Sequence, residues 1–256
     1  MSTRGEPTYT ECLTDHRVLS VRVSPTYTVE DQERMTRARR YFQWQFRLAE
    51  GQLGQRVLEV GCGVGNFTRL LANRQLVVAT DVEPACVEKL RISLGSQVNL
   101  VALEMDVLAE GFRTLAKHEV DSVVCLNVLE HVSDDLQALR NMHAVLPPQG
   151  RVVLIVPAFE GLYGPIDRNL GHYRRYSKRS IAALGKSAGF AAVTARYINS
   201  LGFLGWWWNA RVLKKERQSS LQIRIFDALV VPLMSRLEGR VEPPFGQSLL
   251  VVLIKG

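Results

Sequence analysis

Residues 56–71, RVLEVGCGVGNFTRLL, constrain the fold of this chain more than any other stretch of the sequence. The mainly apolar run 57–60 is typical of a parallel strand that is buried on both faces of a sheet. Gly61, Gly63 and Gly65 follow, and glycine lets the backbone take positive φ and lie directly against a ligand. Apolar residues at helical spacing come next, which predicts a helix start whose unpaired N–H groups favour an anionic group.

An alternative is that the glycine turn is only a tight connection between a strand and a helix and binds no ligand. Two acidic residues argue against this alternative. Glu59 lies within the apolar strand, where a carboxylate is costly unless a cation or a hydrogen-bond donor meets it. A second apolar strand, 76–80, leads to Asp81, where dinucleotide-binding folds place the acid that binds ribose hydroxyls. Asn66 stands where the dehydrogenase fingerprint needs its third glycine, so a nicotinamide cofactor is disfavoured.

Strand and helix patterns alternate along the rest of the chain. Further strands are predicted from apolar runs over 98–103, 120–126, 152–156 and 190–198. Amphipathic stretches between them predict helices, and this alternation is typical of a doubly wound parallel α/β sheet. Ligands bind such sheets at the carboxyl ends of the strands. The polar residues that fall there are Glu59, Asp81, Asp106 and Asn127.

The segment from Glu59 to Gly65, EVGCGVG, resembles motif I of the class I S-adenosylmethionine-dependent methyltransferases, in their small-molecule branch. The resemblance covers about residues 40–198 and includes the NVLEH segment 127–131 and the LPPQG segment 146–150. It implies an α/β fold with a seven-stranded, mostly parallel, Rossmann-like sheet, in which a last strand over 248–254 pairs antiparallel. It also implies S-adenosyl-L-methionine as the cofactor, but it does not identify the methyl acceptor.

The resemblance implies a cofactor site residue by residue. Asp81 would accept the two ribose hydroxyls, and Asp106 the exocyclic amine of adenine, with Val107 packed against the ring. The alternatives are a helix cap at Asp81 and a solvated loop acid at Asp106. The expected cofactor-binding residues are Glu59, Gly61, Cys62, Gly63, Gly65, Asn66, Phe67, Asp81, Val82, Asp106, Val107 and Asn127.

Three residues are candidates for catalysis. Methyl transfer from a sulfonium is an in-line displacement, so the protein mainly has to position the acceptor atom. An oxygen, nitrogen or carbon acceptor must also lose a proton, which a base with a pKa near neutrality removes best. His131 follows the fourth strand and His172 lies in a basic loop at the same rim, so one of them is expected to act as base or to orient the acceptor. Tyr173 is the third candidate, and structural hydrogen bonding is the alternative for His131.

The long loop 157–177 leaves the fifth strand at the rim where ligands bind. It and the helix start that follows carry several arginines interleaved with tyrosines, and arginine suits phosphate or carboxylate. The hypothesis is therefore an anionic acceptor, with a solvated helix start as the alternative. The expected substrate-binding residues are Tyr163, Arg174, Arg175 and Tyr176.

The two ends of the methyltransferase pattern carry additional segments. Residues 1–28 are interpreted as a loosely ordered arm, and 29–256 as one methyltransferase domain that begins with a helix predicted over about 29–50. About fifty residues separate the last two strands, where the minimal fold needs a short turn, so 200–246 is predicted to be a helical cap over the acceptor pocket. A dimer surface and a peripheral membrane contact are the alternatives, because Trp206–Trp208 precede a basic stretch. Both monomer and homodimer remain open.

Composition restricts the class of partner. The formal charge is +7 and the pI near 9.4, which fits either a nucleic-acid partner or a basic enzyme. Base-modifying amino-methylases carry a (D/N)-P-P-(F/Y) motif after the fourth strand, where residues 127–130 read NVLE, so no nucleic-acid partner is expected. The four cysteines have no metal-binding spacing, and no metal site is predicted. A polar N-terminus and reduced thiols favour a cytoplasmic enzyme.

The function predicted from the sequence is methyl transfer from S-adenosylmethionine to a small, anionic acceptor. A carboxylate metabolite or a phosphate-bearing glycan or lipid precursor would fit the basic loop. Two alternatives remain: an RNA or other nucleic-acid methyltransferase, and a non-catalytic cofactor-binding scaffold on the same fold.

Overall fold

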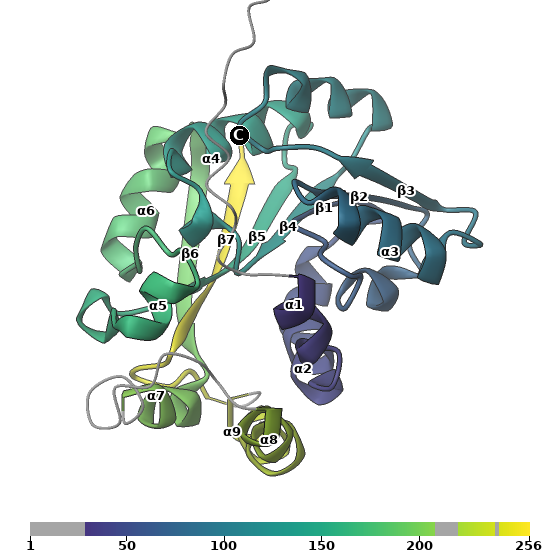
Figure 1. Cartoon of the computed structure of the whole chain (residues 1–256). Coiled ribbons are helices and arrows are strands. Elements are labelled where there is room, and N and C mark those ends of the chain that lie inside the picture. Colours follow the sequence, from purple (N-terminus) through teal and green to yellow (C-terminus); the bar gives the residue numbers. More distant parts are fainter. Residues whose placement is uncertain (1–28, 208–219, 239–240) are drawn as a thin grey trace, which may run out of the picture.

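The computed structural model describes residues 29–207, 220–238 and 241–256, so the predicted arm 1–28 lies outside the described residues. A seven-stranded sheet with the order β3-β2-β1-β4-β5-β7-β6 forms the centre of the molecule (Figure 1). Strands β1 to β5 run parallel, whereas β7 pairs antiparallel with both β5 and β6. The predicted fold class is confirmed. The strands are β1 Arg56–Val60, β2 Leu76–Asp81, β3 Leu100–Glu104, β4 Ser122–Leu126, β5 Arg151–Pro157, β6 Phe190–Ile198 and β7 Ser248–Lys255.

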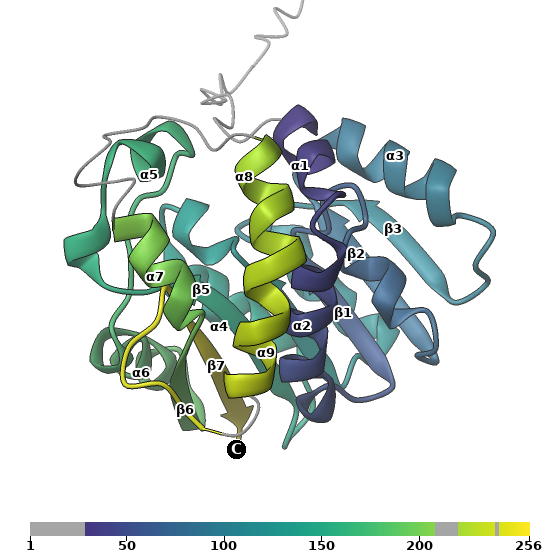
Figure 2. The same cartoon turned by 90° about the horizontal axis from the view of Figure 1, so that it is seen from below.

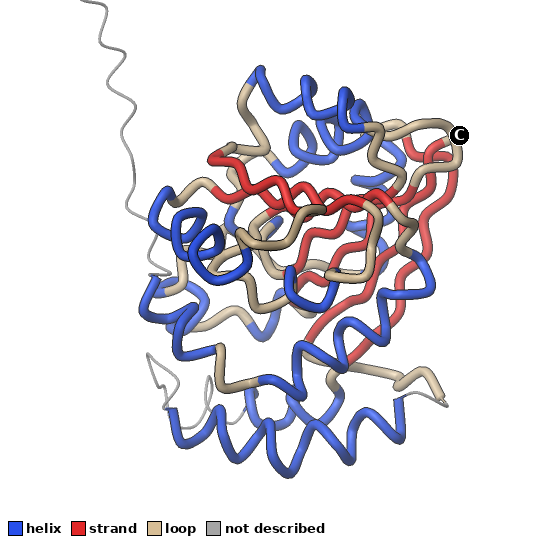
Figure 3. Tube along the Cα trace, turned by 90° about the vertical axis from the view of Figure 1, so that its right-hand side faces the viewer, coloured by secondary structure: helices blue, strands red, loops and turns tan. Residues whose placement is uncertain are grey.

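Helices cover both faces of the sheet (Figure 3). The α-helices are α1 Val29–Met35, α2 Arg39–Ala49, α3 Pro84–Leu94, α4 Asp135–Val145, α5 Pro165–Asn169, α6 Lys178–Ser187, α7 Ser200–Trp207, α8 Ser220–Ile225 and α9 Val231–Glu238. The short 3₁₀ helices are η1 Glu50–Gln52, η2 Thr68–Leu71, η3 Glu110–His118, η4 Leu129–His131 and η5 Glu160–Leu162. A π-helical turn, η7 Phe226–Val230, joins α8 to α9.

The core has two parts because successive strand residues point to opposite faces of the sheet. In β1, Leu58 packs with the residues of η3, α4 and α6, whereas its neighbour Val57 packs with those of α2 and α9. In β4, Val123 and Val124 are divided between the two faces in the same way. Burial on both faces explains why these strands read as continuous apolar runs in the sequence.

Two predicted helices differ from those observed. The single helix expected over 29–50 is interrupted between α1 and α2, where the Thr36 hydroxyl donates to the Glu33 carbonyl 2.7 Å away and competes with the helical bonding pattern. The helix expected after the glycine turn is only the four-residue η2. The chain has little room for a longer helix there, because β2 begins at Leu76.

In the described part of the insertion 200–246, residues 200–207 and 220–238 are helical and residues 241–246 are not, and the role of this insertion as a cap stays a prediction. Pro232 has no N–H to donate to the Ala228 carbonyl, and the π-helical turn η7 directly precedes α9. The Ala228 carbonyl accepts from Arg40 Nη1 instead, at 3.2 Å. Asp227 Oδ1 accepts from the Tyr41 backbone N–H at 2.8 Å, so α8 and α9 lie along α2 (Figure 2).

The outer face of the same insertion is apolar. Five side chains at intervals of four residues are exposed, by between 48% and 70% of their surface: Leu221, Ile225, Leu229, Leu233 and Leu237. Among the described residues, no helix is both long and apolar enough to cross a membrane.

Candidate active site

The glycine turn after β1 is held in a backbone conformation that residues other than glycine rarely adopt. Gly61, Gly63 and Gly65 have φ of 77°, 53° and 85°. The surroundings also leave no space for larger residues. A Cβ on Gly61 would lie 2.2 Å from Val128, and one on Gly63 would lie 1.9 Å from the Gln32 side chain of α1. The turn therefore touches both α1 and the segment that follows β4. We call residues 59–67 together with Asp81 the cofactor edge.

Asp81 lies at the end of β2 and faces this turn. Its Oδ2 accepts from the Gly63 N–H at 2.7 Å, and its Oδ1 from the Glu83 N–H at 3.0 Å. Burial raises the pKa of the Asp81 carboxyl, and these backbone bonds oppose the rise. The N-cap of α3 is Glu83, so Asp81 is not the helix cap that the sequence left open.

Glu59 supplies a buried carboxyl group beneath the turn. Its side chain is 4% exposed, and its Oε2 has no hydrogen-bond partner among the described residues. Burial raises the pKa of Glu59 to about 8, and the charge of Asp81 adds to the rise. A buried acceptor without a partner is costly unless a ligand supplies a donor or a positive charge. A ligand that carries an ammonium or sulfonium group would supply such a positive charge to Glu59.

The other predicted cofactor residues divide into exposed and buried groups. Asp106 is exposed and accepts from the Leu108 N–H at 2.8 Å, while Asn127 is exposed with φ of 53°. Val82 is 53% exposed. All three lie directly after the carboxyl ends of β3, β4 and β2, respectively, where a ligand of a parallel sheet binds.

Four further predicted residues have packing or positioning contacts in this structure. Phe67 is buried, with its ring 5.9 Å from that of Phe46, and Val107 is buried in the core on the other face. Cys62 is a buried free thiol. Asn66 donates from Nδ2 to the Gln32 carbonyl at 3.2 Å and so ties the turn to α1. Their part in cofactor binding stays a prediction.

The loop 158–177 returns to the strand that it leaves. The Tyr176 N–H donates to the Pro157 carbonyl at 2.8 Å, and the Phe159 N–H to the Tyr176 carbonyl at 3.0 Å. Further along, the Tyr173 N–H donates to the Glu130 carbonyl at 2.8 Å. These bonds bring His172 beside the segment after β4. We call residues 127–131 together with 158–177 the acceptor edge.

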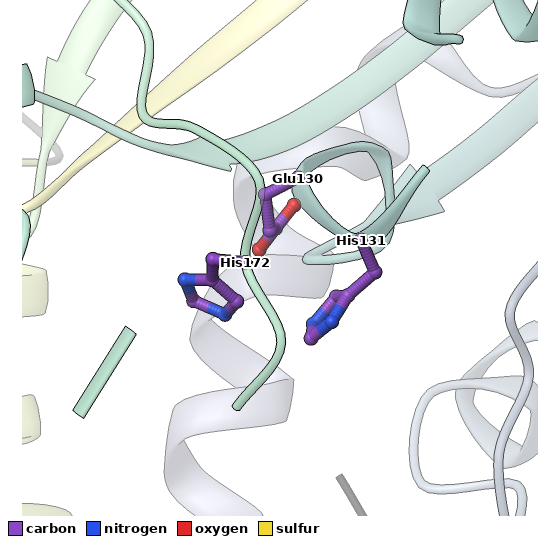
Figure 4. A group of neighbouring side chains, drawn as sticks. All are labelled: Glu130, His131 and His172. Atoms are coloured by element: carbon purple, nitrogen blue, oxygen red, sulfur yellow. The ribbon is translucent and has the colours of Figure 1, made fainter. Parts of the chain in front are cut away.

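The two predicted catalytic histidines meet at this edge. The centroids of the His131 and His172 rings are 4.6 Å apart, and the rings are nearly perpendicular (Figure 4). Burial, together with the neighbouring His172, lowers the pKa of His131 to about 3. His131 is therefore neutral at physiological pH. Because its imidazolium form is disfavoured, it is a weak base for removing a proton from an acceptor.

Glu130 completes this cluster, and the sequence did not single it out as a functional residue. Its side chain is 1% exposed, and its Oε2 has no hydrogen-bond partner among the described residues. Burial raises the pKa of Glu130 to about 7, although His172 and Arg175 oppose the rise. Tyr41 of α2 approaches the same carboxylate: burial raises its pKa to about 12, and the Glu130 charge contributes. Its place in the NVLEH segment 127–131 was the signal that the sequence offered.

Asp167 holds His172 and Arg175 in place at the acceptor edge. It is fully buried, and its Oδ1 lies 2.8 Å from His172 Nδ1 and 2.8 Å from Arg175 Nε and Nη2. Its Oδ2 accepts from the Gly164 N–H at 2.9 Å. Burial alone would raise the pKa of Asp167, but His172 and Arg175 outweigh it and hold the pKa below its ordinary value. No sequence pattern singled out Asp167 as a functional residue.

The predicted substrate-binding residues have partners within the chain. Arg175 is 5% exposed, pairs with Asp167, and lies over the Trp206 ring of α7 at 4.9 Å. Arg174 pairs with Asp135 at 2.7 Å. The buried Tyr176 donates from its hydroxyl to Asp135 Oδ2 at 3.0 Å. These contacts give Arg175 and Tyr176 positioning roles in the fold.

The two remaining tyrosines lie closer to the surface. Tyr163 is half-buried and donates from its hydroxyl to the His172 carbonyl at 2.8 Å. Tyr173 is 56% exposed, and the Arg174 guanidinium lies 5.7 Å from its ring centroid. An exposed side chain next to the histidine cluster can meet a ligand, so a role for Tyr173 in catalysis stays a prediction.

A sheet in this strand order, with one antiparallel strand, a glycine turn after β1 and an acid after β2, defines the class I S-adenosylmethionine-dependent methyltransferases. The profile of the methyltransferase domain family matches residues 32–195, more than half of the chain. The chain belongs to this family, and S-adenosyl-L-methionine is its cofactor.

Individual relatives agree with this assignment. A ubiquinone biosynthesis O-methyltransferase of Vibrio campbellii is 30% identical over 130 residues, which cover 49% of each protein. The chain thus spans about half the length of the curated relatives it matches. A Thermotoga maritima structure, described as a SAM-dependent methyltransferase and possible histamine N-methyltransferase, gives a TM-score of 0.61 at 14% identity, over 90% of this chain and 97% of that one.

A further solved structure is the N-methyltransferase NodS of Bradyrhizobium japonicum in complex with S-adenosyl-L-homocysteine. Its TM-score is 0.50 at 17% identity, over 88% of this chain and 87% of that one. At such identities the two structures show a shared fold.

Proposed function

We propose that the protein transfers a methyl group from S-adenosylmethionine to an oxygen atom of a small-molecule acceptor. The observation that carries the proposal is the position of the Glu130, His131 and His172 cluster. Val128 lies against Gly61, so the segment that bears Glu130 and His131 borders the cofactor turn directly. Groups that can bind or deprotonate an acceptor therefore lie beside the groups that bind the donor.

The cofactor edge supplies the donor site. The cofactor carries its reactive methyl group on a positively charged sulfur. Asp81 would accept the ribose hydroxyls, and Glu59 would meet the positive charge of the methionine portion, because its Oε2 has no partner among the described residues. The bare backbone of the glycine turn lets the ligand approach closely.

The acceptor edge positions the atom that receives the methyl group. The acceptor oxygen loses its proton and forms a bond to the methyl carbon as the carbon–sulfur bond breaks, and the bonding pair stays on sulfur. The name of the Vibrio relatives, O-methyltransferase, supports oxygen as the acceptor atom. The basic loop supports an anionic acceptor less strongly than its sequence suggests, because Arg174 and Arg175 are paired with Asp135 and Asp167.

Peripheral membrane contact through 200–246 stays part of the proposal. What supports it is the exposed apolar stripe on α8 and α9, with Arg224 and Arg236 exposed on the same helices. An acceptor held in a membrane would then reach the acceptor edge from that side. The basic stretch after Trp208 lies outside the described residues.

Turnover tests the proposed function. The wild-type protein, incubated with S-adenosylmethionine and a small-molecule extract, is expected to produce S-adenosylhomocysteine, which chromatography quantifies. Asp81→Ala removes the predicted ribose acid and should abolish the product. Glu104→Ala is the matched control, since Glu104 is an exposed acid paired in register with Asp81 on the neighbouring strand. Equal product from wild type and Asp81→Ala would contradict the proposal.

A further inference from the structure

The side chains of Glu130, His131 and His172 converge at the acceptor edge (Figure 4). Each residue offers one nitrogen or oxygen ligand atom, and these three atoms all lie within 4.8 Å of one another. A divalent ion with bonds of about 2.1 Å could bridge this span after small side-chain rotations. Glu130 and His131 come from η4, and His172 from the loop that returns to β5, so the group is assembled by the tertiary fold.

The carboxylate of Glu130 shows that the cluster needs a partner. It is 1% exposed, and its Oε2 has no hydrogen bond among the described residues. A buried oxygen without a partner is destabilising, and the effect is greater for a charged group. A cation bound by this carboxylate and the two imidazoles would offset that destabilisation.

The surroundings of both histidines resemble the outer shell of a metal site. His172 Nδ1 lies 2.8 Å from Asp167 Oδ1, and Asp167 is itself fixed by Arg175 and by the Gly164 N–H. Metal-binding histidines usually donate their second ring N–H to a carboxylate or a backbone carbonyl, which fixes the tautomer and the ring orientation. With Nδ1–H directed at Asp167, Nε2 of His172 carries the lone pair. His131 hydrogen-bonds the backbone of Leu170 in a similar way.

We propose that Glu130, His131 and His172 bind a divalent transition-metal ion. Two imidazoles and one carboxylate are the ligand set that zinc, iron, manganese, cobalt or nickel accepts, whereas magnesium and calcium prefer oxygen ligands. Three protein ligands leave at least one coordination position for another molecule. The sequence predicted no metal site, because no cysteine or histidine spacing is typical of one and His172 lies 41 residues after the adjacent Glu130 and His131.

The open position gives the ion a role in the reaction, and this part rests on the proposed function. An acceptor hydroxyl that takes this position becomes more acidic and releases its proton to solvent. Its oxygen then forms the bond to the methyl carbon, and the electron pair of the carbon–sulfur bond remains on sulfur. The site would therefore select acceptors with a hydroxyl or adjacent oxygens that bind a divalent ion.

Cobalt binding tests the metal site without any methyl acceptor. Wild-type protein treated with a chelator and dialysed is titrated with Co²⁺, and the visible d–d absorption is followed. One ion per chain is expected, with the intense band of a low-coordinate site that includes nitrogen ligands. Glu130→Gln and His172→Gln each remove a proposed metal ligand. Loss of an outer-shell partner weakens metal binding by roughly 10–100-fold, and each of these variants should weaken cobalt binding by more than that. His143→Gln is the matched control, because His143 lies on α4 with its ring against Phe190.

Stabilisation by S-adenosylhomocysteine is measured on the same proteins. A rise in melting temperature shows that a variant is folded and that its cofactor edge is intact, so failure of the metal site is distinguished from failure of the proposed function. Absence of cobalt binding to wild type, or only the weak band of an all-oxygen octahedral site, would overturn the proposal even if the variants did not fold. Equal affinity in Glu130→Gln, His172→Gln and wild type would also overturn it.

Discussion

The cofactor edge and the acceptor edge of this methyltransferase are built by different means. At the cofactor edge the backbone sets the geometry: three glycines take positive φ, and the N–H groups of Gly63 and Glu83 hold Asp81. At the acceptor edge buried side chains from separate segments set it, with Asp167 holding both His172 and Arg175. The geometry of the cofactor edge therefore depends on few side-chain interactions, whereas that of the acceptor edge depends on many.

This difference predicts different responses to mutation. Loss of a charge from the network around Asp167 leaves other buried charges without partners, which destabilises the whole fold. Glu59→Gln removes a carboxyl group whose Oε2 has no partner among the described residues, so it should change cofactor binding more than stability.

The largest effect is expected for Asp167→Ala. This change leaves the buried Arg175 guanidinium without its carboxylate, and breaking a buried ion pair costs about 3–5 kcal/mol. Urea denaturation gives the free energy of unfolding. Asp134→Ala is the comparison: Asp134 is the exposed N-cap of α4, and loss of such a cap costs about 1 kcal/mol. Similar losses in both variants would show that the network does not support the acceptor edge.

A smaller effect is expected for Tyr176→Phe. The hydroxyl of Tyr176 donates to Asp135 Oδ2, and loss of a buried hydrogen bond costs about 0.5–1.5 kcal/mol in the free energy of unfolding. Tyr173→Phe is the matched control, because the exposed Tyr173 should change stability by less than about 0.5 kcal/mol. If Tyr173→Phe were the more destabilising of the two, the positioning role of Tyr176 would be wrong.

The backbone geometry of the cofactor edge could be predicted because its determinants are local. A run of apolar residues, a glycine turn and an acid after the next strand lie within about thirty residues, and each has a direct backbone consequence. The seven-stranded sheet followed from the same periodicity. The length of η2 and the break before α2 could not be predicted, because they depend on packing and on a local Thr36 hydrogen bond.

The acceptor edge could be predicted only in part. His131 and His172 were placed at the same rim, and the structure brings their rings together. The roles of Arg175 and Tyr176 could not be inferred, since Asp167 and Asp135, their partners, are ordinary polar residues in the sequence. Which arginine is buried depends on tertiary contacts, and composition carries no information about it.

The most direct test of the cofactor edge is a calorimetric titration with S-adenosylhomocysteine at pH 7, in two buffers with different ionisation enthalpies. The pKa of Glu59 is raised to about 8, so most of the carboxyl groups are protonated at pH 7. Pairing with the ligand ammonium group favours the carboxylate, so binding should release close to one proton per site, and the release should vanish well above pH 8. Glu59→Gln should bind more weakly and release no proton.

We expect one S-adenosylhomocysteine to bind per chain, with proton release in wild type and none in Glu59→Gln. No binding by wild type, or equal proton release in both proteins, would contradict this expectation.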